Sequence, residues 1–194
     1  TPNGVDEKFF HPSPSRQYDP TSIQIGWVGK IRAAKNYETA KPALDQLADQ
    51  GFVPQVLAHP KSTREKEMLS HTDMRSFYHG IDYYLCTSWH DGTPNPALEA
   101  AACGIPIVTT RVGNMPELIR HGENGFFVEP TVDSIVSTFQ KLRQLDADAY
   151  ANLSRNILRR IEKGWTWEKN ALNYWPAFKR LLTTGYHHEP VAHL

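Results

Sequence analysis

The sequence has 194 residues, in which 21 lysines and arginines balance 21 aspartates and glutamates. This neutrality argues against non-specific nucleic-acid binding and against a polybasic membrane surface as the main activity. A hydrophobic content of 40% excludes a disordered chain, and two cysteines are too few for a disulfide scaffold or a four-cysteine zinc site. No apolar run approaches the ~18 residues of a membrane span. The first residue is Thr1 rather than methionine, so we expect the chain to be part of a longer protein.

The first 22 residues hold four prolines and show little periodicity, which is typical of a linker. From residue 23 onward, short apolar runs alternate with amphipathic segments. We expect strands at 23–29, 53–58, 83–86, 105–109 and 125–129. Helices are expected at 36–50, 63–79 and 94–103.

Beyond residue 130 the periodicity is only helical, with apolar faces that begin at Ile135, at Tyr150 and within 166–183. Pro176 is expected to kink or restart the last helix. The alternation of strands and helices predicts an α/β fold, a Rossmann-like, doubly wound parallel sheet flanked by helices. Because ligands of such sheets bind beyond the carboxyl ends of the strands, the loops of interest are 29–36, 59–63, 87–95 and 109–115.

The loop at 87–95 carries the most chemistry. Gly92 lets a ligand approach the backbone, and Pro94 suits the first turn of the helix that follows. Free N–H groups at that helix start favour a phosphate. Asp91 and Glu99 could face one cleft and accept hydrogen bonds from sugar hydroxyls. The alternative is that Asp91 caps the helix and Glu99 is solvated.

Two other loops offer ligand-binding groups. Lys30, Arg32 and Lys35 follow the first strand, where cations could neutralise a departing diphosphate. A solvated basic surface is the alternative. Gly113 and Asn114 could offer backbone amides to a ligand, or could form a plain turn.

Other cofactor and catalytic motifs are missing. Residues 26–29 lack the third glycine of a dinucleotide fingerprint, and the sequence has no GxxxxGK[ST] segment. Cys86 and Cys103 lack metal-ligand spacing to a histidine and are expected to be small core residues. Ser88 lies in no GxSxG elbow.

Four segments together resemble the C-terminal domain of retaining GT-B glycosyltransferases of family 4. Residues 2–10 (PNGVDEKFF) resemble the segment that closes the N-terminal domain of that family. Gly29, Lys30 and Lys35 resemble its GR…K motif. Residues 91–108 (DGTPNPALEAAACGIPIV) resemble its E-x7-E block, and 113–117 (GNMPE) with 122–125 (GENG) resemble its G..PE…G.NG segment.

The resemblance implies a domain that binds a nucleotide-diphosphate sugar. It implies that Lys30 and Lys35 bind the diphosphate and stabilise the leaving group. Asp91 is the third residue with an implied catalytic role, in contact with the donor sugar. It also implies transfer with retention and no need for a metal ion or other cofactor. The implied donor-binding residues are Gly29, Gly92, Thr93, Pro94, Asn95, Glu99, Gly113 and Asn114, with Glu99 on the ribose hydroxyls.

The sequence departs from the family pattern at several places. Asp91 stands where the family has Glu, Lys30 where it has Arg, and Asn36 where it commonly has Gly. The stretch at 58–82 is short and lacks a strand that family members usually have there.

The resemblance divides the chain into a linker at 1–22, a nucleotide-sugar-binding domain at 23–164 and a return helix with tail at 165–194. It implies an N-terminal acceptor-binding domain outside these residues, on which Trp165, Trp167 and Trp175 would pack. The alternative is that these tryptophans are core. The expected partners are the sugar donor and a glycan, lipid or protein acceptor. We expect no nucleic-acid partner and no transmembrane segment. We expect a cytoplasmic location, with peripheral association with a membrane left open, and no sugar transfer by this chain alone.

Two other functions remain open from the sequence. The first is a non-catalytic or degenerate domain of the same fold, which binds a nucleotide sugar or docks a partner. The second is a sugar epimerase of a related GT-B-like type, for which His90 is the candidate catalytic histidine. Binding of UDP or GDP would separate the leading interpretation from a domain that only docks partners.

Overall fold

Five parallel strands form one sheet in this computed structural model, which describes residues 3–15, 17–60 and 69–184. The strands are β1 (Gln24–Lys30), β2 (Val53–His59), β3 (Tyr83–Cys86), β4 (Ile107–Thr109) and β5 (Gly125–Phe127). The α-helices are α1 (Tyr37–Asp49), α2 (His71–His79), α3 (Asn95–Ala102), α4 (Met115–Leu118), α5 (Val132–Leu142), α6 (Ala147–Gly164) and α7 (Trp167–Thr184).

The strand order is β2-β1-β3-β4-β5, and every neighbouring pair is parallel. All five expected strands are present, and the Rossmann-like doubly wound class is confirmed. Strand ends differ from expectation by one or two residues, as at β4, which begins at Ile107 rather than at residue 105.

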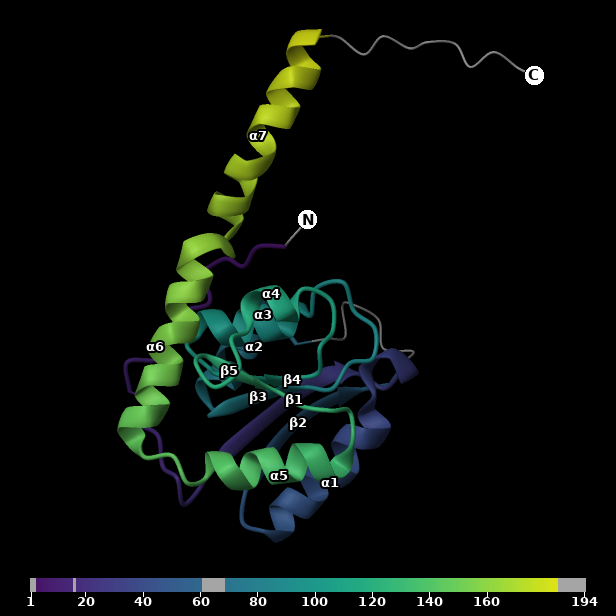
Figure 1. Cartoon of the computed structure of the whole chain (residues 1–194), viewed down its shortest axis with the longest axis vertical. Helices are drawn as coiled ribbons and strands as arrows, with labels where there is room; N and C mark the ends of the chain where they lie inside the picture. Colours follow the sequence, from purple (N-terminus) through teal and green to yellow (C-terminus); the bar gives the residue numbers. More distant parts are fainter. Residues whose placement is uncertain (1–2, 16, 61–68, 185–194) are drawn as a thin grey trace, which may run out of the picture.

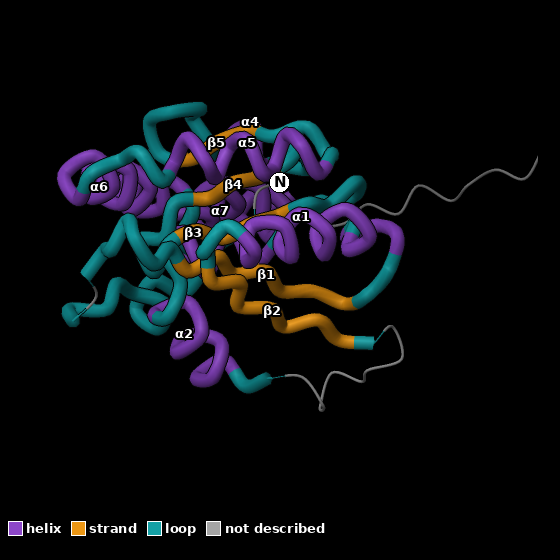
Figure 2. Tube along the Cα trace, turned by 90° about the horizontal axis from the view of Figure 1, so that it is seen from below, coloured by secondary structure: helices purple, strands orange, loops and turns teal. Residues whose placement is uncertain are grey.

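Helices cover both faces of the sheet, with α1 and α5 on one side and α2, α3 and α4 on the other (Figures 1 and 2). Each face has its own apolar core. Helix α6 contributes to both: Tyr150 and Leu153 pack into the core under α1 and α5, whereas Ile157 and Ile161 pack into the core with α3. The two halves of the fold are therefore held together by one helix as well as by the sheet.

Local sequence explains where the helices start and stop. The side chains of Thr131 and Asp146 accept hydrogen bonds from backbone N–H groups in the first turns of α5 and α6. Ser70 and Asp73 form a capping box at α2. Helix α1 buries its apolar stripe and is followed by Gly51, whose φ of 84° suits a glycine after a helix.

The N-terminal segment is bound to the start of α7. The backbone N–H of Val5 donates to the carbonyl of Trp165 (2.9 Å), and Trp167 N–H donates back to Val5 (3.2 Å). Val5 and Phe10 are buried in the core, so this part of the expected linker packs on the domain. Helix α7 projects away from the sheet (Figure 1).

The tryptophans behave differently from one another. Trp165 is buried, as the core alternative expected, but Trp167 and Trp175 are 54% and 59% exposed, so that alternative is wrong for these two. Both belong to an exposed apolar set along α7 that also includes Leu172, Phe178, Leu181 and Leu182.

Two helix predictions need correction or restriction. Helix α7 continues through Pro176 as one helix, so the predicted restart is wrong. In the segment expected to be helical at 63–79, α2 begins only at His71, and residues 63–68 lie outside the described residues. Among the residues that the structure describes, no helix has the length and apolar character needed to cross a membrane.

Leu44 tests whether the α1 face is a packed core. Its side chain is 1% exposed, so Leu44→Ala is expected to lower the free energy of unfolding by about 2–5 kcal/mol in urea denaturation. Leu172, which is 69% exposed on α7, is the matched control, and Leu172→Ala is expected to stay within about 0.5 kcal/mol of the unsubstituted chain. Equal effects of the two substitutions would contradict this packing.

Candidate functional site

The direction in which strands are added to the sheet reverses between β1 and β3. The chain goes from β1 outward to β2, then returns to place β3 on the other side of β1. Such a switch point opens a crevice at the carboxyl ends of the two strands, between the loops that follow them. These loops are 31–36 after β1, which includes a short 3-10 turn at Ala33–Lys35, and 87–94 after β3.

The two loops are fastened to each other. The backbone N–H of Trp89 donates to the carbonyl of Ala34 (2.9 Å), and the Thr87 hydroxyl donates to the carbonyl of Lys35 (2.9 Å). The next residue, Asn36, adopts φ 51°. Asn is among the few non-glycine residues that tolerate this left-handed conformation, which explains how it can replace the glycine of the family pattern.

Lys35 and Asp91 form an ion pair across these loops. The Lys35 ammonium donates to Asp91 Oδ2, and the two side chains are only 15% and 16% exposed. Asp91 therefore does not cap α3, whose first turn has no side-chain cap. The structure brings together two of the three residues with implied catalytic roles. The third, Lys30, is the half-buried last residue of β1, and Arg32 is exposed.

Backbone N–H groups without partners follow Asp91. Within the described part of the chain, the N–H groups of Asp91, Gly92, Thr93 and Asn95 donate no hydrogen bond. Gly92 faces open space, because nothing lies within 4 Å of the position that a Cβ would take. Helix α3 begins at Asn95, one residue after the expected start. Adjacent free amides at a helix start form an anion-binding site.

The turn at 110–114, after β4, packs against the loop at 91–93. Gly113 has φ 50°, and a Cβ there would lie 2.2 Å from the Gly92 carbonyl oxygen. The backbone N–H of Asn114 donates to that same oxygen (3.2 Å), and its side chain donates to the Thr93 hydroxyl (2.7 Å). The prediction that Asn114 offers a free amide is therefore wrong, because this amide already holds the loop; the N–H of Gly113 has no described partner.

Glu99 lies in the second turn of α3 and is half-buried rather than exposed on a solvated surface. Its carboxylate accepts a hydrogen bond from the Tyr78 hydroxyl (2.7 Å). Burial raises the pKa of Glu99 above its ordinary value, while the Tyr78 hydrogen bond and the charge of His71 oppose the rise. Glu99 lines a cavity of about 380 Å³ with His71, Asn95 and Trp167.

The two carboxylates do not share one hollow, contrary to expectation. Asp91 lines a more open hollow of about 490 Å³, whose wall also includes Trp89, His90 and Arg111. Residues 93–95 connect it along the chain to the Glu99 cavity. A ligand that touches both carboxylates would therefore extend across the start of α3.

Sequence reasoning missed two side chains of the Asp91 hollow. Trp89 is 52% exposed although its backbone is bonded to Ala34. Arg111 stacks on the ring of Phe127, with 4.2 Å from its guanidinium carbon to the ring centre. Both could have been found from the sequence by their positions in the loops that follow β3 and β4. His90 is exposed in the same wall.

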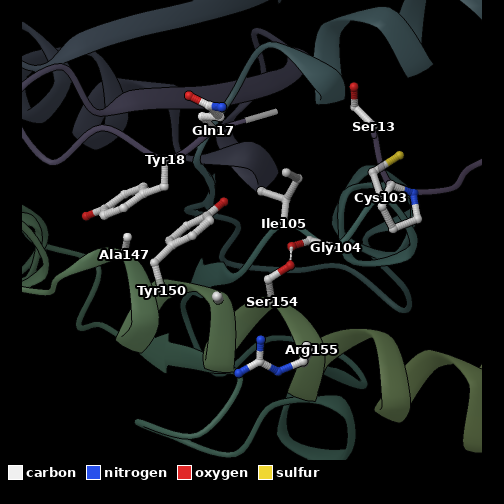
Figure 3. A pocket seen from close by; sticks show the side chains of 12 residues that line it. Ser13, Gln17, Tyr18, Cys103, Gly104, Ile105, Ala147, Tyr150, Ser154 and Arg155 are labelled. Carbon is white, nitrogen blue, oxygen red and sulfur yellow. Dashed lines mark hydrogen bonds between the residues drawn. The ribbon is translucent and has the colours of Figure 1, made fainter. Parts of the chain in front are cut away.

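A cavity of about 520 Å³ lies at the opposite end of the sheet, near the amino ends of β3 and β4 (Figure 3). It is bounded by the segment before β4 and by the start of α6. Two of its polar groups are already paired: the Ser154 hydroxyl donates to the Gly104 carbonyl (2.7 Å) and the Tyr150 hydroxyl to the Asp82 carbonyl (2.9 Å). Burial raises the pKa of the Cys103 thiol to about 12, so this thiol is inert. Arg155 is the one charged side chain among the described residues that line this cavity.

A double-mutant cycle tests the Lys35–Asp91 pair. Lys35→Met or Asp91→Leu alone leaves one charge largely buried, and each is expected to cost about 1–3 kcal/mol of unfolding free energy. The double variant removes both charges and should cost less than the sum of the two single variants. Lys41→Met, which breaks an exposed pair with Asp45, is the control and is expected to cost no more than about 0.5 kcal/mol. Additive single effects at Lys35 and Asp91 would contradict the pairing.

The raised pKa of Glu99 predicts a pH-dependent stability. Above an ordinary pKa of about 4.5 the unfolded chain is ionised at this position, while the folded chain retains the proton to higher pH. The protonated Glu99 side chain therefore favours the folded state fully below about pH 4.5. This contribution to the unfolding free energy is lost as the pH rises through the pKa that Glu99 has in the folded chain. Glu99→Gln should raise the unfolding free energy relative to the unsubstituted chain more at pH 7.5 than at pH 4.5. A difference that does not change with pH would contradict this account.

A family model supports the resemblance seen in the sequence. The model described as "Glycosyl transferases group 1" matches residues 23–145, which span the sheet from before β1 to beyond α5. Curated relatives align with most of this chain at 22–28% identity, and the chain spans 38–45% of their length. It is thus less than half as long as these relatives.

Solved structures show the same fold. Sucrose-phosphate synthase from Thermosynechococcus elongatus matches with a TM-score of 0.80 at 19% identity, over 95% of this chain and 52% of that one. The C-terminal domain of a glycosyl transferase group 1 family protein from Francisella tularensis matches with a TM-score of 0.71 at 22% identity, over 84% of this chain and 100% of that one. HepE from Anabaena, solved with UDP and glucose, matches with a TM-score of 0.70 at 17% identity, over 94% of this chain and 56% of that one. The structural neighbours are GT-B glycosyltransferases, and the chain belongs to the glycosyl transferases group 1 family.

Proposed function

We propose that this chain is the donor-binding half of a glycosyltransferase that moves a sugar from a nucleoside diphosphate to a glycan, lipid or protein acceptor. The observation that carries the proposal is the run of unpartnered backbone amides at Asp91–Thr93 and Asn95, beside the ammonium of Lys35. Amides and a cation that converge at a helix start favour a diphosphate.

The ligand is proposed to lie across the start of α3. Its diphosphate takes the free amides and approaches Lys35, while its ribose hydroxyls donate to Glu99 in the adjoining cavity. Tyr78 holds the Glu99 carboxylate in position for that contact. Asp91 and the backbone of Gly92 then face the donor sugar.

Transfer is proposed to proceed with retention. The bond between the sugar's anomeric carbon and the phosphate oxygen breaks, and the acceptor oxygen forms the new bond from the same face. The acceptor proton passes to the departing diphosphate. Lys35, Lys30 and the amides stabilise the charge of that leaving group, so the proposed mechanism assigns no role to a metal ion or other cofactor.

A second half of the active site is proposed to come from an N-terminal domain. Two observations support this: the chain spans 52% of the synthase that it resembles, and α7 exposes an apolar set that has no cover among the described residues. We propose that this set packs on the N-terminal domain and that the present chain alone binds donor without transferring sugar. A cytoplasmic location, with or without peripheral membrane contact, agrees with a nucleotide-sugar donor.

Calorimetric titration with UDP and GDP tests donor binding. The unsubstituted chain is expected to bind at least one of them, and Glu99→Ala or Lys35→Met should lower the affinity about tenfold or more. Lys41→Met, on the exposed side of α1, should leave it unchanged. Melting curves identify any variant that fails to fold. No binding of either nucleotide would favour the degenerate, partner-docking interpretation instead.

A further inference from the structure

A basic hollow lies between the second half of α6 and the turn at 120–124. Its volume is about 320 Å³, and we name it the α6 hollow. Four cations line it, Arg120, Arg159, Arg160 and Lys163, against one carboxylate, that of Glu123. This concentration of positive charge is unusual in a chain whose charges balance overall.

The cations come from two elements that are fixed to each other. On α6, spacings of three and four residues place Asn156, Arg160 and Lys163 along one face. Asn156 donates to the carbonyl of Glu123 (2.9 Å), and the Arg160 guanidinium donates to the carbonyl of Glu117. The hollow therefore has a fixed frame.

The turn itself is also held from within. The side chain of Asn124 is buried and accepts from the backbone N–H of Arg120 (2.7 Å). It donates in turn to the carbonyl of Leu118 (3.2 Å). Arg120 is thus presented to the hollow from a rigid turn.

Within the described residues no carboxylate forms an ion pair with these four cations, although Glu123 lies in the same wall. The side chains of Arg120, Arg159 and Lys163 make no hydrogen bond or ion pair there, and Nε of Arg160 is buried without a partner. By contrast, Lys8, Lys35 and Lys41 each pair with a carboxylate. The dipole of α6 favours a cation in its last turn, which accounts for Lys163 but not for Arg120 on a separate turn.

We propose that the α6 hollow binds the phosphate group of a small soluble phosphorylated molecule. Guanidinium groups match the geometry of phosphate oxygens and bind them with paired hydrogen bonds. The volume suits a phosphate with a small substituent rather than a polymer. The turn precedes β5, at the amino end of the strand, whereas the proposed donor site lies at the carboxyl ends of β1 and β3. The two sites share no residue.

Thermal denaturation and NMR titration of the 194-residue chain test the proposal. Inorganic phosphate and pyrophosphate are the probes, each compared with chloride at equal ionic strength because exposed charges are screened by salt. Both are expected to raise the melting temperature and to shift the backbone resonances of 120–124 and 156–163.

Exposed cations allow a variant that keeps the fold. Arg159→Gln/Lys163→Gln removes two unpaired charges and is expected to lower the phosphate affinity about tenfold or more while leaving UDP binding unchanged. The control variant Lys141→Gln/Lys169→Gln removes two positive charges elsewhere and should change neither the phosphate affinity nor the binding of UDP. An unchanged phosphate affinity in the first variant would overturn the proposal, independently of whether UDP binds.

Two other outcomes would show that phosphate is not the ligand of the α6 hollow. Resonance shifts confined to residues 30–35 and 91–95 would mean that phosphate binds only at the proposed donor site. Binding to vesicles that contain phosphatidylglycerol, with no response to either soluble probe, would mean that this surface contacts a membrane. Both outcomes contradict the proposal.

Discussion

The ion pair between Lys35 and Asp91 joins the two loops that flank the switch point of the sheet. A largely buried ammonium is costly unless a carboxylate holds it, and here that carboxylate comes from the loop after the next strand of the sheet. Together with the hydrogen bonds from Trp89 to Ala34 and from Thr87 to Lys35, the pair fixes the distance between the loops. The unpartnered amides begin at Asp91 itself, so the same contact positions the groups to which we assign the diphosphate.

The pair also shapes the electrostatics of the proposed site. Asp91 neutralises Lys35 in this structure, so the attraction of the proposed diphosphate depends on the amides and on the remaining cations. Asp91 is one methylene shorter than the glutamate of the family pattern, and it is already engaged by Lys35. Gly113 packs against the carbonyl oxygen of Gly92, and the Asn114 N–H donates to it, so this turn holds the loop that carries the free amides. Glu99, in its own cavity, depends instead on Tyr78 and on burial.

The sequence predicted what depends on local pattern. Strands such as 83–86 and the apolar face of α1 follow directly from periodicity and from glycines at turns, and the loops at the switch point follow from the strand order expected of the class. Contacts between residues that are far apart in the sequence could not be predicted from such patterns. The Lys35–Asp91 pair spans 56 residues, and the bond from Tyr78 to Glu99 spans 21. The backbone bond that occupies the Asn114 amide, and the exposure of Trp167, likewise depend on packing that no local pattern encodes.

A crystal structure of the chain with bound nucleoside diphosphate tests the central claim most directly. The account predicts that the diphosphate oxygens accept hydrogen bonds from the backbone N–H groups of residues 91–93 and 95 and lie near the Lys35 ammonium, with the ribose hydroxyls on Glu99. A diphosphate bound in the cavity beside Tyr150, or in the α6 hollow with the start of α3 empty, would contradict it.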